Sequence, residues 1–128
     1  MKRSIKIADL RASGALAFDL IDLIALLGER ALVSAWRASE VWTVQEGDNG
    51  RFEELCESGR PIAGADFVAA LKPVIQVIDG RFEAFEAGDK EPWAVVEAID
   101  SSYFLLHAEE DVIQKAHARF RSVADYSA

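Results

Sequence analysis

The first pattern along the chain is a helical repeat of apolar residues. The repeating residues are Leu16, Leu20, Leu23, Ile24 and Leu27. Asp19 and Asp22 fall on another side of the same helix, so the segment is amphipathic. Ser13 is a suitable N-cap, and Gly28 stands where a helix would end. The spacing therefore predicts a first helix between Ser13 and Gly28.

The next segment, Ala31–Val44, has two interpretations. It is rich in strand-forming residues from Val41 onward and is compatible with a strand throughout. Its first half also suits a helix, because alanine, leucine and arginine favour that state. Glu46–Gly50 is rich in turn-forming residues and predicts a turn. A short helix is expected over Phe52–Glu57.

A third helix is predicted from Ala65 to Ile78. Its apolar stripe consists of Phe67, Leu71, Val74, Ile75 and Ile78. Pro73 lies inside this stretch, so we expect a kink there, because proline lacks an amide donor and clashes with the preceding turn. Asp79-Gly80 would end the helix.

Two hairpins follow in succession. The first strand is expected over Arg81–Glu86 and is followed by a loop over Ala87–Glu91. The second strand spans Pro92–Ile99 and leads through a tight turn at Asp100-Ser101 into a third strand, Ser102–Ala108. Alternating apolar and polar positions bounded by turn residues are typical of such strands.

A last helix is predicted to begin at Glu109-Glu110-Asp111, because acidic residues are favoured at a helix N-terminus. A short final strand within Phe120–Tyr126 is compatible with the residues there. Helices on both sides of a run of hairpins predict one α+β domain over residues 1–128. We expect an antiparallel sheet of about four to five strands packed against about four helices, covered on one face.

Composition places the chain among globular proteins. It has 128 residues, of which 51% are hydrophobic and 28% charged, which is an ordinary balance for a folded domain. Cys56 is the single cysteine, so no intrachain disulfide can form, and a reducing compartment fits best. The apolar stretch Ala15–Leu27 is interrupted by Asp19 and Asp22 and is too short to span a bilayer. We therefore expect a soluble, cytoplasmic protein without a membrane partner.

Charge is distributed unevenly along the chain. Between Asp79 and Asp111 there are ten acidic and two basic residues, which equals the formal net charge of −8 of the whole sequence. Such a concentration of negative charge affects which partners the protein can bind. Nucleic acid is disfavoured as a partner, because binding phosphates needs clustered lysine and arginine.

The acidic residues of the first hairpin form the candidate partner-binding set. They are Glu83, Glu86, Asp89 and Glu91. Only Arg81 and Lys90 lie near them in the sequence to offset their charge. One interpretation is an acidic docking surface, where the field would speed encounter with a basic protein. The other is a solvated sheet edge, where charges prevent aggregation.

A second hypothesis concerns carboxylates beside tryptophans. Strand alternation places Trp93, Glu97 and Ile99 on one face, so Glu97 is either partly buried beside apolar groups or extends to solvent. The same alternation would place Trp36, Glu40 and Trp42 together. A cleft between the sheet and the third helix would then bind a small ligand, although core packing explains tryptophans equally well. Its lining residues would be Trp36, Glu40, Trp42, Trp93 and Glu97.

No catalytic, nucleotide-binding or metal-binding motif is present in the sequence. His107 and His117 lack the spacing of a metal site, Asp100-Ser101 suits a turn, and there is no glycine-rich phosphate loop. The sequence therefore favours a non-enzymatic, cofactor-free, acidic protein of bacterial type that binds a macromolecule, for example a toxin-neutralising immunity protein or inhibitor. A ligand-binding or enzymatic domain is the alternative. The oligomeric state stays open.

Overall fold

The computed structural model describes residues 2–45 and 50–127. Within these residues the strands are Lys2–Ile7 (β1), Ala35–Gln45 (β2), Ile62–Ala63 (β3), Val74–Phe85 (β4), Ala94–Ile99 (β5), Tyr103–Glu109 (β6) and Val123–Asp125 (β7). The helices are Leu20–Leu27 (α1), Glu29–Leu32 (α2), Arg51–Glu57 (α3), Gly64–Leu71 (α4) and Glu110–Arg119 (α5). The predicted α+β class is confirmed, with seven strands and five helices in the described residues rather than four to five and four.

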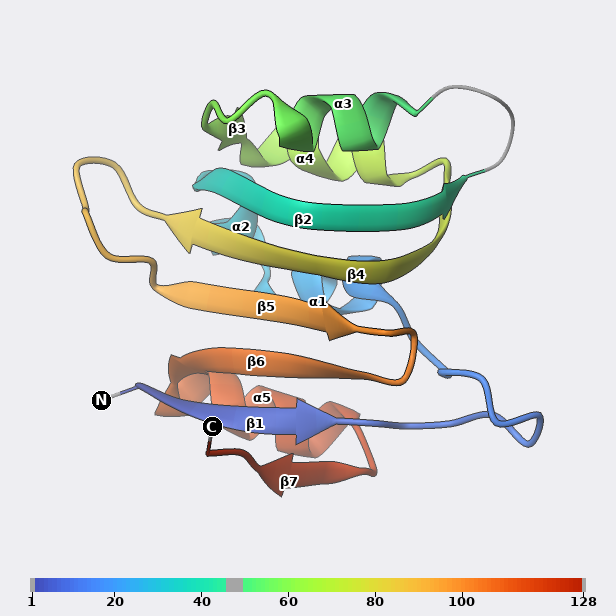
Figure 1. Ribbon diagram of the computed structural model, residues 1–128. Helices are drawn as coiled ribbons and strands as arrows, with labels where there is room; N and C mark the ends of the chain where they lie inside the picture. Colours follow the sequence, from blue (N-terminus) through green and yellow to red (C-terminus); the bar gives the residue numbers. More distant parts are fainter. Residues whose placement is uncertain (1, 46–49, 128) are drawn as a thin grey trace.

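All strands join one sheet in the order β3-β2-β4-β5-β6-β1-β7 (Figure 1). Every pair is antiparallel. The two hairpins over β4, β5 and β6 are confirmed, as are the short helix α3, the last helix α5 and the final strand β7. The turn predicted over residues 46–50 lies almost entirely outside the described residues.

The N-terminal strand β1 was not expected from the sequence. It lies between β6 and β7, so the two ends of the chain are adjacent in the sheet (Figure 1). Ile5 and Ile7 are fully buried, whereas Ser4 and Lys6 between and beside them are only half-buried. This alternation fits a strand with one face on the core, but it extends over too few residues to predict a strand unaided.

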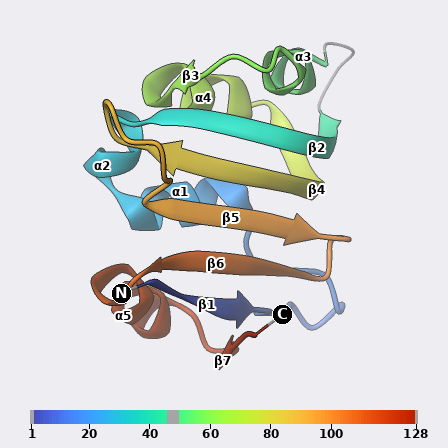
Figure 2. The same ribbon diagram turned by 60° about the vertical axis from the view of Figure 1, so that its left-hand side comes forward.

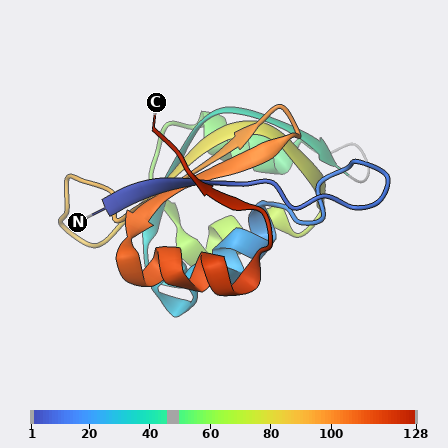
Figure 3. The ribbon, with the colours of Figure 1, turned by 90° about the horizontal axis from the view of Figure 1, so that it is seen from below.

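Helices cover one face of the sheet. α1, α2 and α5 lie together on that side, and no described helix lies over the opposite face of β4, β5, β6 and β1 (Figure 3). α3 runs along β2 at the end of the sheet, beside α4 (Figure 1). The expectation of a sheet covered on one face is therefore confirmed.

The first helix begins later than predicted, at Leu20 instead of after Ser13. Asp19 is the N-cap, and its carboxylate accepts a hydrogen bond of 2.8 Å from the amide of Leu20. Asp22 accepts a bond of 2.8 Å from the amide of Asp19, which completes a capping box. The Asp19 carboxylate also accepts from the amide of Val77 in β4, at 3.1 Å. The capping box of Asp19 and Asp22, and not Ser13, therefore sets the start of the helix.

The third helix is shorter than predicted. α4 ends at Leu71, and the chain is already in β4 from Val74 onward, so Pro73 ends the helix instead of kinking it. The sequence V-I-Q-V-I after the proline is rich in β-branched residues, which favour a strand. Asp79-Gly80, expected to end the helix, lies inside β4 where its pairing with β2 is irregular. The predicted helix over residues 65–78 is therefore half helix and half strand.

Residues 31–44 also divide between the two predicted states. α2 covers Glu29–Leu32, and β2 begins at Ala35. Trp36 in β2 is completely buried and stacks on Phe67 of α4, with ring centroids 4.8 Å apart. Stacked aromatic pairs of this kind stabilise a core beyond the area they bury.

Cys56 of α3 is buried in the same core. Burial, together with the nearby carboxylates Glu53 and Glu57, raises the pKa of its thiol to about 12. Because the thiolate is the nucleophile and metal ligand, this cysteine is an unreactive core residue.

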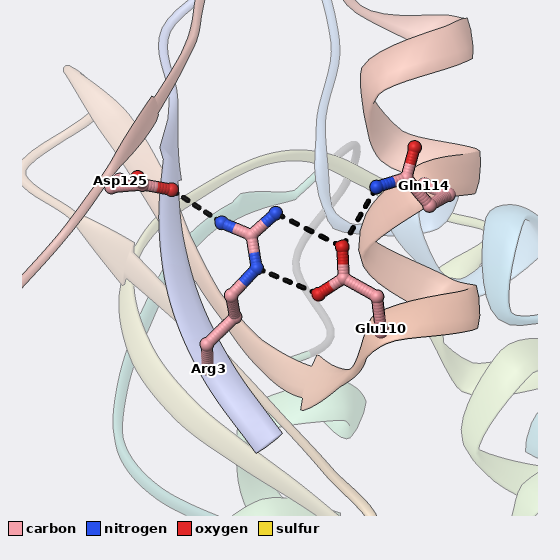
Figure 4. Close-up of polar contacts among 4 residues, drawn as sticks. All are labelled: Arg3, Glu110, Gln114 and Asp125. Carbon is pink, nitrogen blue, oxygen red and sulfur yellow. Dashed lines mark hydrogen bonds and ion pairs between the residues drawn. The ribbon is translucent and has the colours of Figure 1, made fainter. Parts of the chain in front are cut away.

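A polar cluster joins β1, β7 and α5 (Figure 4). The guanidinium of Arg3 donates to both carboxylate oxygens of Glu110, at 2.8 and 3.2 Å, and also to Asp125. The side-chain amide of Gln114 donates to Glu110 at 2.7 Å. The hydrogen bonds from Arg3 and Gln114 lower the pKa of Glu110 to about 2. The cluster fastens the N-terminal strand to the last helix.

The Glu110→Gln variant is expected to be less stable than the wild type at neutral pH and equally stable in strong acid. A carboxyl group whose pKa is lowered on folding stabilises the protein above its ordinary pKa of 4.5, and this contribution disappears as the pH falls towards the folded-state value. Urea unfolding of both proteins between neutral pH and strong acid measures the difference. A difference that stays constant with pH would contradict the ion pair.

Candidate functional site

The acidic residues of the first hairpin gather around the connection between β4 and β5. We call residues 86–93 the β4–β5 loop. It extends beyond the end of the sheet (Figure 1), and each residue from Glu86 to Glu91 is exposed. In the second view the loop passes close to α2 (Figure 2). The loop is therefore the most prominent irregular segment of the hairpins that sequence analysis singled out.

Arg30 of α2 fixes one side of the loop. Its guanidinium donates to both oxygens of Glu86, from Nη2 to Oε1 at 2.6 Å and from Nε to Oε2 at 3.1 Å. These hydrogen bonds hold the pKa of Glu86 below its ordinary value. The same guanidinium lies over the indole of Trp93, 4.0 Å from the ring centroid. One arginine thus contacts both ends of the loop.

Trp93 fixes the other end of the loop in the core. It is 5% exposed, and its amide donates to the carbonyl of Ala84 at 2.9 Å. Its indole Nε1–H donates to Oγ of Ser34 at 2.8 Å, and the Ser34 hydroxyl donates to the carbonyl of Arg30 at 2.6 Å. Buried polar groups are satisfied throughout this chain of bonds. The base of the loop is consequently held in one arrangement while its tip is solvated.

Two shallow hollows lie on either side of the loop. One, of about 360 Å³, is bordered by Lys2, Arg30 and Trp93. The other, of about 590 Å³, is bordered by Arg37 and Phe85, among others. Loop residues line both hollows, and both are open to solvent. A partner that surrounds the loop would find a concave surface on each side of it.

The charge around the loop is less one-sided than its sequence suggests. Glu86 forms an ion pair with Arg30, which is distant in the sequence. Oε2 of Glu83 lies 3.7 Å from Nη2 of Arg81. The inference that only Arg81 and Lys90 offset these carboxylates is therefore wrong. Asp89 and Glu91 differ, since neither forms an ion pair with any residue in 2–45 or 50–127. These two carboxylates are the ones left to interact with a partner.

The tryptophan–glutamate cleft is not formed. Trp36 is buried, but Trp42 is 60% exposed. Glu40 has a positive φ of 53°, and the pairing of β2 with β4 shifts between Ser39 and Trp42. Such a bulge reverses the alternation of the side chains beyond it. The prediction that Trp36, Glu40 and Trp42 share a face is therefore wrong.

Glu97 lies on the side of β5 that faces away from the core, because Val96 and Ala98 beside it are buried in the core cluster. Its carboxylate accepts a hydrogen bond of 2.7 Å from Nη1 of Arg81 in the neighbouring strand. Trp93 lies just before β5 and belongs to the core cluster instead. Of the two interpretations of Glu97, the one in which its side chain extends to solvent is correct. Glu97 and Trp93 do not line a common pocket.

Sequence reasoning missed the residues that organise the loop. Arg30 and Ser34 lie more than fifty residues before Glu86 and Trp93, and nothing in their own surroundings marks them. Pairing such residues requires the fold.

Comparison of the chain with models of known protein families, with curated proteins and with solved structures gives no match. Within residues 2–45 and 50–127, no group of three or more histidine, cysteine, aspartate and glutamate side chains is placed to hold a metal ion. None of the helices described is both long and apolar enough to cross a membrane. Functional inference therefore depends on the geometry of the β4–β5 loop.

Proposed function

We propose that the protein acts without catalysis in the cytoplasm, by binding a basic protein through the β4–β5 loop. A toxin-neutralising immunity protein, or a comparable inhibitor, is the concrete form of this proposal. The observation that supports it best is the loop itself, which has a solvated acidic tip, a base fixed by Arg30 and Trp93, and a hollow on each side.

The fixed base lowers the cost of binding. A loop that is ordered before it meets its partner loses less conformational entropy on association. Arg30 holds Glu86, and Ser34 holds Trp93, so the partner does not have to order the ends of the loop. The proposal therefore predicts that the loop binds with little change in its backbone.

The sign of the charge selects the partner class. Asp89 and Glu91 extend into solvent and have no ion pair within the described residues, in a chain of net charge −8. Negative potential of this kind steers a positively charged protein and repels nucleic acid. Lysine or arginine side chains of the partner would meet these carboxylates at the tip, and apolar side chains could enter the hollows.

The double variant Asp89→Asn/Glu91→Gln is expected to bind the partner about tenfold more weakly, with a smaller salt dependence. The chain is first immobilised to identify a protein that binds saturably, and binding of that purified protein is then measured by calorimetry at low and high salt. Both replaced side chains are exposed, so the melting temperature should change by no more than a few degrees.

A matched control removes the same charge elsewhere. Glu54→Gln/Glu57→Gln alters two exposed carboxylates of α3, which line neither hollow beside the loop. This variant should bind like the wild type. Equal binding by the wild type and the loop variant would overturn the proposal, as would the lack of any protein that binds saturably and salt-dependently.

A further inference from the structure

The face of the sheet opposite the helices carries several large apolar side chains among its polar ones. Outward positions of an antiparallel sheet with one buried face are usually polar. Here they include Phe85, Val95, Ile99, Tyr103 and Leu105. Val95 is only 6% exposed and lines a hollow together with Tyr126 of the C-terminal segment. No described helix lies on this side of the central strands (Figure 3). We call this surface the open face, and its central strands are β4, β5, β6 and β1.

The polar groups of the open face are already paired with one another. Arg81 donates to Glu97 across β4 and β5 at 2.7 Å. Oγ of Ser4 and Nδ1 of His107 are 2.7 Å apart across β1 and β6. The two pairs and Leu105 line one hollow of about 290 Å³. Because these groups keep their hydrogen bonds when water leaves, covering the face costs less than burying unpaired polar groups.

The open face is also nearly neutral in a strongly acidic protein. The charged side chains at its outward positions are Lys2, Lys6, Arg37, Asp79, Arg81, Glu83, Glu97 and Glu109. The four bases and four acids cancel to a formal charge of zero, so the whole net charge of −8 lies on the rest of the chain. The electrostatic repulsion between two copies is therefore weakest when they approach with their open faces toward each other.

We propose that the open face binds the open face of a second copy of the chain. A two-fold axis through such a surface brings each residue opposite the same patch of the other copy. Interleaved lysine, arginine and glutamate side chains are complementary to themselves in that arrangement, whereas a uniformly charged face would not be. This inference is independent of the proposed function of the β4–β5 loop.

The sheet edges do not offer the alternative of strand pairing between copies. β3 covers only Ala35 and Trp36 of β2, but the rest of that edge is bulged at Glu40 and partly closed by α3. There the carboxylate of Glu53 accepts a hydrogen bond of 2.8 Å from the backbone amide of Thr43. At the other edge β7 has three residues. Short, bulged or covered edges resist pairing with another chain.

The test is the molar mass of the full chain in solution, measured by light scattering and sedimentation equilibrium. The wild type is expected at twice 14.1 kDa. Leu105→Lys places a charge on the half-buried centre of the open face and should weaken the dimer at least tenfold. Leu32→Lys makes the same change at a 44% exposed position on α2 and should remain a dimer.

Lys6→Glu provides a second variant, which decides the matter if Leu105→Lys does not fold. It changes the formal charge of the open face from 0 to −2, so it should also dissociate the dimer, most strongly at low salt. A wild type that sediments as one chain at the highest soluble concentration overturns the proposal. A dimer that folded Leu105→Lys and Lys6→Glu leave intact overturns it equally. Neither result bears on binding by the loop.

Discussion

Replacing Gly64 by alanine is expected to destabilise the protein by about 3 kcal/mol, near the upper end for overpacking a core. Gly64 opens α4, and its amide donates to the carbonyl of Ser34 at 2.9 Å. A Cβ at this position would lie 2.2 Å from the carbonyl oxygen of Ala31 and 2.6 Å from that of Leu32. Both are backbone atoms of α2, so the strain cannot be relieved by rotating a side chain.

The functional consequence extends beyond stability. If α2 moves away from α4 to admit the methyl group, Arg30 moves with it and its bonds to Glu86 are lost. We therefore expect faster amide exchange in the β4–β5 loop of the Gly64→Ala variant than in the wild type. Urea unfolding and hydrogen exchange measure the two effects.

Gly50→Ala serves as the control for Gly64→Ala. A Cβ at Gly50 would meet nothing within 4 Å, and its φ is not positive. Its change in stability should be within about 1 kcal/mol. If Gly64→Ala were as stable as the wild type, the close approach of α2 to α4 would not exist in solution.

Trp93→Ala should have the second large effect, with a loss of about 3 to 5 kcal/mol in the free energy of unfolding. The side chain is 5% exposed, donates to Ser34 and lies beneath Arg30. Its removal leaves a cavity, deprives the Ser34 oxygen of the hydrogen bond that it accepts, and leaves Arg30 without the ring beneath it. The loop should then lose its fixed base, and amide exchange of its residues should rise.

Trp93→Phe separates packing from hydrogen bonding. It keeps an aromatic ring but cannot donate to Ser34, so the hydrogen bond alone should cost about 1 kcal/mol, and some further loss comes from the smaller ring. In a double-mutant cycle with Ser34→Ala, the two changes should be less than additive, because both remove the same bond. Full additivity, or a loss below about 1 kcal/mol in Trp93→Ala, would show that Trp93 does not anchor the loop.

The parts of the fold that could be predicted have signals within a few residues of one another. The strands from Arg81 to Ala108 alternate regularly, and Asp100-Ser101 supplies the tight turn between two of them. The helix after Glu109 has its acids at the N-terminus and its bases near the C-terminus. Because the causes are local, sequence patterns are sufficient there.

Elements whose causes are not local were predicted poorly. β1 has six residues and exists because β6 and β7, at the other end of the chain, pair with it. Val74–Ile78 is spaced like a helix stripe, yet pairing with β2 makes it strand. At Glu40 a single bulge moved Trp42 from the expected inner face to the surface. Whether such a segment forms a strand, and which face its side chains occupy, depends on its pairing with the neighbouring strand.

The sequence by itself determined the α+β class, the hairpins and the position of the acidic loop between two strands. Only the tertiary structure decided which charges meet, because Arg30 lies 56 residues from Glu86, and Arg3 lies 107 residues from Glu110. Backbone preferences act between neighbours along the chain, whereas ion pairs act through space. The net charge of a segment could thus be counted in advance, but the field it presents to a partner could not.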